Sequence, residues 1–406
     1  MSTRVLVNLL WLVPGVVGGS EESTTDALRA VADALGAGES TASRSGRGKQ
    51  IEVHLAVLEQ FADAHADLAE RFQTHVLDQD GRDKRRRVVA EQTWLASLTR
   101  AISADVVHHA GGVLPLRHPG RTVLTVHDLQ PLDLPRNFRA LKRTYITTMI
   151  GRSARAADVV SVPSRFTRDR VVDLLGVGAD DVLVVPWWVA PPTPPTPPAP
   201  SGPADGTGAG AGFPLPPWLG SDPFVLYPAI TYPHKNHLTL LDAFAEVART
   251  HPDLRLVLTG GVASAEADVQ LRLRRADLDG RVLRTGRVPV EQLESLFAAS
   301  SVVVVPSLYE GFGLPVLEAM GRGAPVLAAD AGSLPEVARP EDLVGPNDVA
   351  GWAAAIAAVV DEDPGARADR IRAGRERASL FTPERTANAL LYVYHRAAGI
   401  PEPSDR

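Results

Sequence analysis

The chain has 406 residues, of which 45% are hydrophobic and 22% are charged. This length exceeds what one hydrophobic core usually supports, so we expect two or more domains, and the composition excludes a mostly disordered chain. The formal net charge of −6 argues against a nucleic acid partner, and the absence of cysteine excludes disulfides and thiolate metal sites.

The chain opens with an apolar stretch at residues 5–14, preceded by Arg4. A secretory signal peptide begins in the same way. Here, however, Pro14 and Gly15 end the stretch without a small-residue cleavage site, and the stretch is too short to span a bilayer. We therefore expect a buried first strand over residues 5–12 and a cytoplasmic protein.

Strand-like and helix-like segments alternate through the first half of the chain. A glycine-rich turn and a helix follow the first strand, and further strands are expected at 50–57, 105–108, 121–127, 157–162 and 181–185. The alternation predicts the α/β fold class, with a doubly wound parallel sheet in a first domain at residues 1–186. Ligands of such domains bind beyond the carboxyl ends of the strands, where Gly19 and His127 fall.

The composition changes abruptly at residues 187–221, where a run of prolines is followed by a run of glycines. Proline-rich chain is stiff and extended and glycine-rich chain is flexible, so neither can form a packed core. We interpret this segment as a linker or exposed insertion between two domains. Recruitment of a partner that binds proline-rich peptides is the alternative.

The second half repeats the alternation and predicts a second doubly wound domain at residues 222–380. Its strands are expected at 223–227, 255–258, 282–285, 301–305 and 324–328, and helices at 237–250, 290–300 and 315–321. A last helix is expected within residues 381–400, because Thr382 can cap it and Pro383 suits its first position. Its apolar face must pack against one of the two domains.

Two glutamates flank a glycine-rich turn after the apolar strand at 301–305. Glu310 stands at the strand exit, and Glu318 lies in the helix that follows the turn. Gly311 and Gly313 let the backbone approach a ligand closely, and the free N–H groups at the helix start favour an anion. This pattern predicts an anion-binding turn; an ordinary turn with two solvated acids is the alternative.

A second candidate loop, at residues 228–237, follows the first strand of the second domain and opens a helix. Doubly wound domains hold phosphate at this position. Lys235 can supply a point charge to a diphosphate, and His234 or His237 can add a hydrogen-bond donor. An ordinary surface lysine is the alternative, although a cation at a helix start is unfavourable to the helix dipole.

Weaker signals lie in the first half of the chain. Gly18 and Gly19 lack the full glycine pattern of a dinucleotide loop, so a plain tight turn fits equally well. His127 ends a strand at the expected ligand edge, and a buried core histidine is the alternative. Basic clusters at 84–87 and 136–143 predict solvated faces, or a surface for a membrane or an anionic acceptor.

Together these residues resemble the family four glycosyltransferases of the GT-B fold, in which two Rossmann-like domains face each other across a cleft. Glu310 and Glu318 match the Glu-x7-Glu motif of that family, Lys235 matches its basic residue for the diphosphate, and Gly19 and His127 match its N-terminal landmarks. The likeness covers nearly the whole chain. It implies that the last helix crosses back to the first domain.

The resemblance implies an enzyme, a hexosyltransferase that retains configuration and uses no metal or other cofactor. Glu310 would contact the donor hexose, Glu318 would hold the ribose hydroxyls and Lys235 would steady the leaving diphosphate. His127 would contact the sugar and help to place the acceptor. Further donor contacts would come from Gly19, His234 and the backbone N–H groups of Gly311, Phe312, Gly313 and Leu314.

One departure concerns the second phosphate contact. Many members of the family carry an arginine six residues before the lysine, where this chain has Ala229. Around the lysine, residues 232–237 have the sequence Tyr-Pro-His-Lys-Asn-His, which resembles a subgroup of bacterial mannosyl and hexosyl transferases. This resemblance favours GDP-mannose as the nucleotide sugar.

The acceptor stays open between a glycan, a lipid-linked molecule and a small molecule. The resemblance implies no nucleic acid partner and is compatible with peripheral contact at the inner membrane surface. A nucleotide-sugar epimerase or hydrolase of the same fold is one alternative. A non-catalytic binding subunit is the other.

Overall fold

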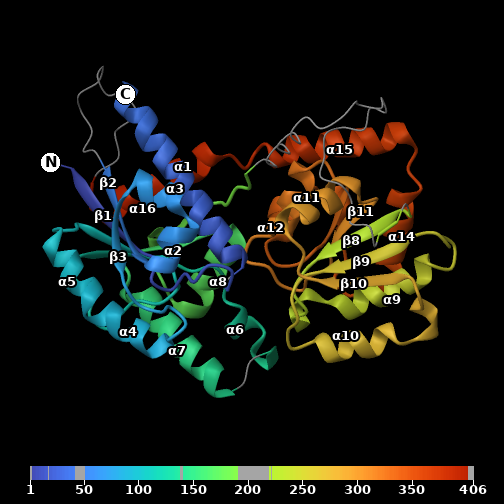
Figure 1. Cartoon of the computed structure of the whole chain (residues 1–406), viewed down its shortest axis with the longest axis horizontal. Helices are drawn as coiled ribbons and strands as arrows, with labels where there is room; N and C mark the ends of the chain where they lie inside the picture. The colour runs from blue at the N-terminus through green and yellow to red at the C-terminus, as the bar shows by residue number, and fades with distance from the viewer. Residues whose placement is uncertain are drawn as a thin grey trace, which may run out of the picture. The chain divides into compact units, whose positions relative to one another are not determined.

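The computed structural model describes residues 2–16, 18–41, 51–137, 140–190, 219–220 and 222–400. The chain divides into two compact units (Figure 1). Met1–Val189 and Phe381–Arg406 form the first unit, and Ala190–Leu380 form the second. Most of the proline- and glycine-rich segment expected at 187–221 lies outside the described residues.

The described part of the first unit is built on a parallel sheet with the strand order β3-β2-β1-β4-β5-β6-β7. The chain starts at the centre, builds one edge, and then returns to build the other half. A ligand crevice forms beyond the carboxyl ends of such a sheet at the switch point, here between β1 and β4. The strands are β1 Thr3–Asn8, β2 Ile51–Leu58, β3 Gln73–Leu77, β4 Val106–His109, β5 Arg121–Thr125, β6 Val159–Val162 and β7 Val182–Val184.

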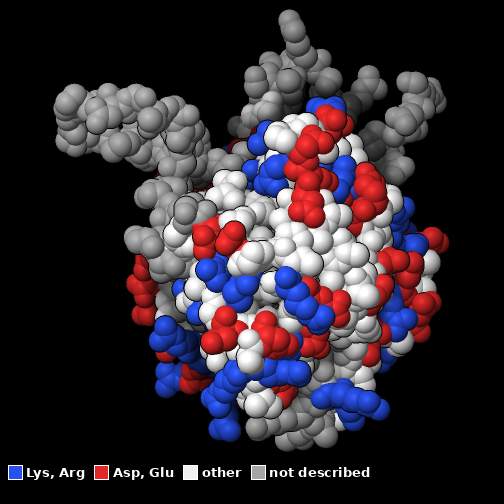
Figure 2. Space-filling view, turned by 90° about the vertical axis from the view of Figure 1, so that its right-hand side faces the viewer, with Lys and Arg blue, Asp and Glu red and all other residues white. Residues whose placement is uncertain are grey.

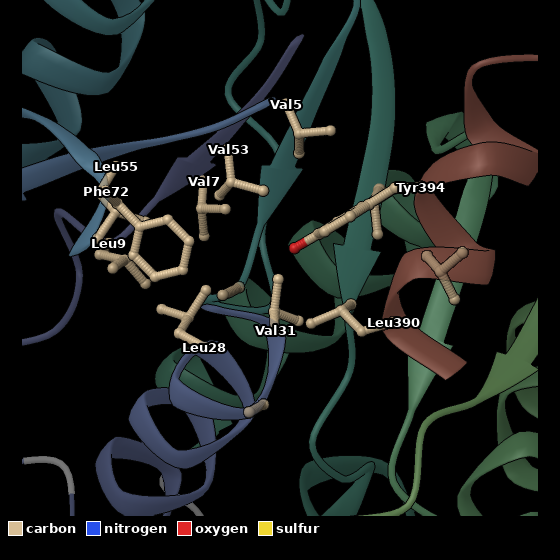
Figure 3. Packing of buried hydrophobic residues seen from close by; sticks show 14 of the residues in the cluster. Val5, Val7, Leu9, Leu28, Val31, Val53, Leu55, Phe72, Leu390 and Tyr394 are labelled. Atoms are coloured by element: carbon tan, nitrogen blue, oxygen red, sulfur yellow. The ribbon is translucent and has the colours of Figure 1, made fainter. Parts of the chain in front are cut away.

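Helices cover both faces of this sheet, and each face has its own apolar core. Val5 and Val7 belong to one core together with residues of α1 and α16 (Figure 3), whereas Leu6 packs with Leu95 of α5 in another. Both faces of the strand are buried, as in other parallel sheets. The helices are α1 Gly19–Thr41, α2 Glu59–Ala64, α3 Ala66–Arg71, α4 Lys84–Gln92, α5 Trp94–Ala101, α6 Gln130–Asp133, α7 Ala140–Ala156, α8 Arg165–Leu175 and α16 Pro383–Ala397.

The last helix, α16, belongs to the first unit and lies beside α1, at the other end of the sequence (Figure 1). Leu390, Val393 and Tyr394 of α16 are buried in the core, and Figure 3 shows Leu390 and Tyr394 there. The Tyr394 hydroxyl lies 3.0 Å from Nδ1 of His108 in β4. The side chain of Thr382 accepts a hydrogen bond from the first turn of the helix, as the sequence pattern indicates.

The first strand is shorter than predicted, because β1 ends at Asn8 and not at residue 12. The Asn8 side chain accepts a hydrogen bond from the Leu10 backbone N–H at 3.2 Å. This local bond stabilises a turn in place of further strand. Leu9, Leu10 and Leu12, which follow Asn8, are nevertheless fully buried. The apolar run therefore continues past the end of β1, and the sequence pattern predicted a strand that was too long.

The described part of the second unit contains a parallel sheet with the order β10-β9-β8-β11-β12-β13, wound like the first and with its switch point between β8 and β11. The strands are β8 Phe224–Pro228, β9 Arg255–Thr259, β10 Val282–Gly286, β11 Val302–Val305, β12 Val326–Ala329 and β13 Leu343–Val344. The helices are α9 His237–Val247, α10 Glu266–Leu273, α11 Val290–Ala299, α12 Leu314–Gly321, α13 Leu334–Val337, α14 Val349–Val360 and α15 Pro364–Ala378.

The core of the second unit contains large apolar side chains from its sheet and its helices. Tyr227, Phe244, Phe297 and Trp352 are almost completely buried, and α9 packs against α14. The face shown in Figure 2 carries basic and acidic side chains interspersed. Two doubly wound units with parallel sheets confirm the predicted α/β fold class.

Candidate functional site

Two loops of the second unit meet at the carboxyl edge of its sheet. One follows β8 and contains the short 3-10 turn Pro233–Lys235, and the other follows β11 and leads into α12. The strands β8 and β11 are paired neighbours at the switch point, so the two loops leave the sheet side by side. The Leu308 N–H donates to the His234 carbonyl oxygen at 2.7 Å and ties the loops together.

Lys235 and Glu310, one from each loop, form an ion pair. The Lys235 Nζ lies 2.6 Å from the Glu310 Oε1, and the two side chains are only 18% and 13% exposed. Burial alone would raise the pKa of Glu310. The charge of Lys235 and hydrogen bonds from Lys235 and Ser307 have the opposite and larger effect, so the pKa of Glu310 is lowered overall. The Glu310 carboxylate is therefore ionised at neutral pH.

Hydrogen bonds fix the backbone on both sides of Lys235. The Tyr227 hydroxyl at the end of β8 donates to the Lys235 carbonyl oxygen at 2.6 Å. The next residue, Asn236, has a φ of 57°, in the left-handed region that asparagine tolerates better than most residues. The Asn236 side-chain amide donates to the Pro346 carbonyl oxygen at 2.7 Å. Lys235 therefore stands on a well-defined turn before α9.

The Glu310 backbone is held from the loop that follows β12. The Ser333 hydroxyl donates to the Glu310 carbonyl oxygen at 2.9 Å, and Ser333 is fully buried. Gly332 has a φ of 60°, and a Cβ added there would lie 2.9 Å from the Glu310 nitrogen. Only glycine fits this conformation and this close approach. The sequence analysis missed both supporting residues, because a Gly-Ser pair after a strand is a common turn pattern.

The glycine-rich turn places a helix start next to the ion pair. Gly313 has a φ of 109° and precedes α12, and a Cβ added there would lie 2.8 Å from the Leu334 side chain. The Phe312 side chain is buried, so its backbone is the part that can face a ligand. The first N–H groups of a helix have no acceptor within the helix and favour an anion. Glu318 lies half-buried within α12.

His234, beside Lys235, contributes a hydrogen-bonding ring without charge. Burial, and then the charge of Lys235, lowers the pKa of His234 to about 4. The ring stacks on Tyr232, with 5.6 Å between centroids and 18° between planes. A neutral imidazole donates one N–H, so His234 does not replace the positive charge of the arginine that is missing at Ala229.

Arg284, in the middle of β10, is a basic residue near the two loops that the sequence analysis missed. Its guanidinium donates to the Gly260 carbonyl oxygen at 2.8 Å and to Glu266 Oε2 at 3.1 Å. The Thr231 hydroxyl, in the loop after β8, donates to the same Glu266 oxygen at 2.8 Å. Through Glu266, Arg284 thus stabilises the loop after β8, which is the candidate phosphate-binding loop.

The first unit holds the other two candidates, His127 and Gly19. The Nε2 of His127 lies 2.8 Å from the Ala110 carbonyl oxygen, and burial lowers the pKa of His127, so the ring is neutral and Nε2 carries the proton. Trp11 and Trp187 pack against the ring, each with 5.7 Å between centroids. Gly19 is exposed and is the first residue of α1.

The candidates therefore fall into two sets. The second unit contains Lys235, His234, Glu310, Glu318 and the glycine-rich turn, and the first unit contains Gly19 and His127. Over the described ranges, no group of three or more histidine, aspartate or glutamate side chains could hold a metal ion. No helix in the part of the chain that the structure covers is long and apolar enough to cross a membrane.

Comparison with known proteins gives two family matches. The model described as "Glycosyltransferase Family 4" matches residues 43–191, and the model described as "Glycosyl transferases group 1" matches residues 216–377. The second match contains the Lys235 and Glu310 loops, and the first contains His127.

Two curated relatives illustrate the sequence similarity. The O-antigen chain mannosyltransferase B of Escherichia coli is 30% identical over 262 residues, which cover 64% of this chain and 66% of that protein. The D-inositol 3-phosphate glycosyltransferase of Acidothermus cellulolyticus is 32% identical over 258 residues, which cover 59% of this chain and 55% of that protein. The chain thus spans just under two thirds of the length of these relatives, or less.

Solved structures share the fold over nearly the whole chain. The sucrose-phosphate synthase of Thermosynechococcus elongatus has a TM-score of 0.72 at 21% identity, over 98% of this chain and 100% of that one. The Anabaena HepE structure, in complex with UDP-glucose, has a TM-score of 0.64 at 18% identity, over 96% of this chain and 98% of that one. At these identities the likeness shows the fold.

Proposed function

Because the chain belongs to the glycosyltransferases that carry a family 4 domain and a group 1 domain, we propose that it moves a hexose from a nucleotide diphosphate sugar to an acceptor. The observation that carries this proposal is the Lys235–Glu310 pair, with 2.6 Å between its charged atoms, at the switch point of the second sheet. At this switch point, a cation that can bind a diphosphate lies beside a carboxylate that can contact a sugar.

The proposed reaction requires charge stabilisation more than a strong base. When the bond between the sugar and the diphosphate breaks, negative charge grows on the diphosphate and positive charge grows on the sugar ring. The Lys235 ammonium and the backbone N–H groups at the start of α12 stabilise the leaving diphosphate. Glu310 faces the hexose, and Glu318 binds the ribose hydroxyls. We propose that the reaction retains the configuration of the sugar and uses no metal ion.

GDP-mannose is the donor that we propose. The support comes from a relative named O-antigen chain mannosyltransferase B, together with the His-Lys-Asn variant of the phosphate loop. The related inositol phosphate glycosyltransferases and the Anabaena complex with UDP-glucose make other donors worth including in the test. The acceptor class is a glycan, a lipid-linked sugar or a small molecule.

The experiment is a screen of nucleotide sugars with and without acceptors, in which chromatography measures the remaining donor, any new nucleotide sugar and the released nucleoside diphosphate. A transferase releases the diphosphate from one donor only when an acceptor is added. Turnover of the donor alone would instead indicate an epimerase or a hydrolase, and absence of binding to every nucleotide sugar would indicate a non-catalytic subunit. Unchanged activity in EDTA is expected, and a loss that Mg²⁺ or Mn²⁺ restores would contradict the metal-free proposal.

We also propose a cytoplasmic location with peripheral contact at the inner membrane surface. Lys84, Arg85 and Arg86 are exposed at the start of α4, and the next turn exposes Val88 and Val89 at 42% and 60%. Several cations at a helix start are unfavourable to the helix dipole, and basic residues beside apolar ones suit an anionic bilayer. Sedimentation with phosphatidylglycerol vesicles, but not with phosphatidylcholine vesicles, is expected.

A further inference from the structure

A small cavity of about 40 Å³ lies within the first unit, between its sheet and the helices α1 and α16. Strands β1, β4, β5 and β6 contribute to its walls, and Leu390 of α16 closes one side. Most lining side chains are buried. Thr24, His127 and Trp187 keep some exposed surface, so the cavity opens beside these three residues.

The floor of the cavity is polar but its hydrogen bonds are made within the protein. The Nε2 of His108 lies 2.7 Å from the Thr125 hydroxyl, and its Nδ1 lies 3.0 Å from the Tyr394 hydroxyl. Burial lowers the pKa of His108 to about 3, so this ring is neutral. The floor therefore has a fixed shape and no charge.

His127 brings an unused acceptor to the same cavity. Its Nε2–H donates to the Ala110 carbonyl oxygen, which leaves Nδ1 as a bare acceptor. Nδ1 is buried and has no partner among the described residues. A buried acceptor without a partner costs free energy, and a ligand that donates a hydroxyl hydrogen would recover it.

The lining offers no charge to a ligand. Within the described residues it contains neither lysine nor arginine, and neither aspartate nor glutamate. The Trp187 ring stands at the mouth, and the buried walls are mostly aliphatic. An aromatic ring with a nearby hydroxyl acceptor suits the C–H face and the hydroxyl edge of a sugar. A phosphate in this cavity would be a buried anion without a cation.

We infer that this cavity binds a neutral, hydroxyl-bearing part of the acceptor, namely the edge of a sugar ring whose face rests on Trp187 and whose hydroxyl donates to Nδ1 of His127. The inference rests on the proposed function and narrows its acceptor to a neutral carbohydrate. The volume of about 40 Å³ admits a few non-hydrogen atoms, so most of the ring lies at the mouth. Acceptors recognised through a phosphate on that sugar are disfavoured.

The test measures binding of matched neutral and phosphorylated ligands to the full chain. The pairs are D-mannose with D-mannose 6-phosphate, and myo-inositol with D-myo-inositol 3-phosphate. Saturation-transfer NMR detects the binding of each ligand, and competition between the two members of a pair compares their affinities. We expect the neutral member of at least one pair to bind 10-fold or more tightly than its phosphorylated partner. A preference for the phosphorylated members, or no binding of either neutral sugar, would overturn the inference.

Two variants and a control locate the binding. Trp187→Leu removes the ring face, and His127→Phe keeps a ring against Trp11 but removes the Nδ1 acceptor. Trp188→Leu is the matched control, because Trp188 donates to the Asp26 carbonyl oxygen and does not line the cavity. We expect a 10-fold or larger loss of sugar affinity in the first two variants only, with circular dichroism confirming that all three fold.

The affinity for nucleoside diphosphate separates the two proposals. If the cavity assignment is wrong but the enzyme is a glycosyltransferase, Trp187→Leu leaves the affinity for the sugar unchanged while the diphosphate still binds. If the proposed function is wrong, the wild-type chain binds no nucleoside diphosphate.

Discussion

The Lys235 ammonium and the Glu310 carboxylate lie 2.6 Å apart although 75 positions separate them in the chain. They meet because β8 and β11 are adjacent at the switch point, and each residue lies in the loop that follows one of these strands. The pair has a functional consequence. If a donor diphosphate binds Lys235, as we propose, it must share or replace the contact between Lys235 and Glu310, so the affinity for the diphosphate and the charge of Glu310 are coupled.

Replacing Lys235 tests the phosphate role. In Lys235→Ala, we expect the affinity for the nucleoside diphosphate to fall by about 10-fold or more, because a charge-assisted hydrogen bond contributes about 1.5–3 kcal/mol. Isothermal titration calorimetry measures this affinity. Lys84→Ala is the matched control, since Lys84 is exposed on α4 in the first unit. Equal affinities in Lys235→Ala and the control would exclude the assigned role.

Replacing Glu310 tests the catalytic role. Glu310→Gln keeps the size of the side chain and removes the negative charge, so the developing charge on the sugar loses its partner. We expect kcat to fall by about 10²-fold or more, whereas the affinity for the nucleoside diphosphate should stay the same or rise, because Lys235 loses its competing carboxylate partner. Glu318→Ala should do the opposite and mainly weaken nucleotide binding. A Glu310→Gln enzyme with normal kcat would disprove this assignment.

The loop residues of this site could be predicted from the sequence, but their contacts could not. Lys235 and Glu310 each follow an apolar strand, and a glycine-rich turn marks the second one. Their pairing depends on the strand order, which no local pattern contains. Gly332 and Ser333 could not be identified from the sequence because they contact Glu310 through its backbone, and a backbone contact requires no particular side chain at the partner position.

For the fold, too, some elements could be predicted from the sequence and others could not. Buried strands such as β1 and β11 are long apolar runs, and these were predicted, although the apolar turn after Asn8 made β1 appear too long. Two edge strands were missed. β3 carries exposed Gln73 and Val76 and polar neighbours, so its pattern resembles a loop, and β13 contains only two residues.

Gly332 provides a test of the loop that holds the Glu310 backbone. Gly332→Ala forces a left-handed conformation on alanine and pushes its Cβ to 2.9 Å from the Glu310 nitrogen. Gly280→Ala is the matched control, because Gly280 has a φ of 66° but nothing within 4 Å of an added Cβ. Each variant should lose about 1–2 kcal/mol of unfolding free energy from the strained backbone.

Only Gly332→Ala should also lower catalysis. We expect kcat to fall by about 10-fold or more, because a displacement of about 1 Å at a reacting group can cost as much as 10²-fold. Steady-state kinetics with the selected donor measures the difference. If the two variants have the same kcat, then the contact between Gly332 and Glu310 has no role in positioning the carboxylate.

The buried His108 makes the stability of the first unit depend on pH. Its folded pKa of about 3 lies below its ordinary value of 6.5, so the unfolded chain binds a proton near pH 6.5 and the folded chain does not. The stabilisation is therefore complete above pH 6.5 and is lost as the pH falls towards 3, by about 1.4 kcal/mol for each pH unit. Urea denaturation between pH 4 and pH 8 measures the slope.

Two variants separate the titration of His108 from its hydrogen bond to Tyr394. Removing the titrating ring in His108→Gln should make the unfolding free energy less steep below pH 6.5, by about 1.4 kcal/mol per pH unit. Tyr394→Phe keeps the ring but leaves Nδ1 without its partner at 3.0 Å, so we expect a loss of about 1–3 kcal/mol at pH 8 with no reduction of the slope. Identical slopes in His108→Gln and the wild type would show that this histidine is not the group whose protonation destabilises the folded chain.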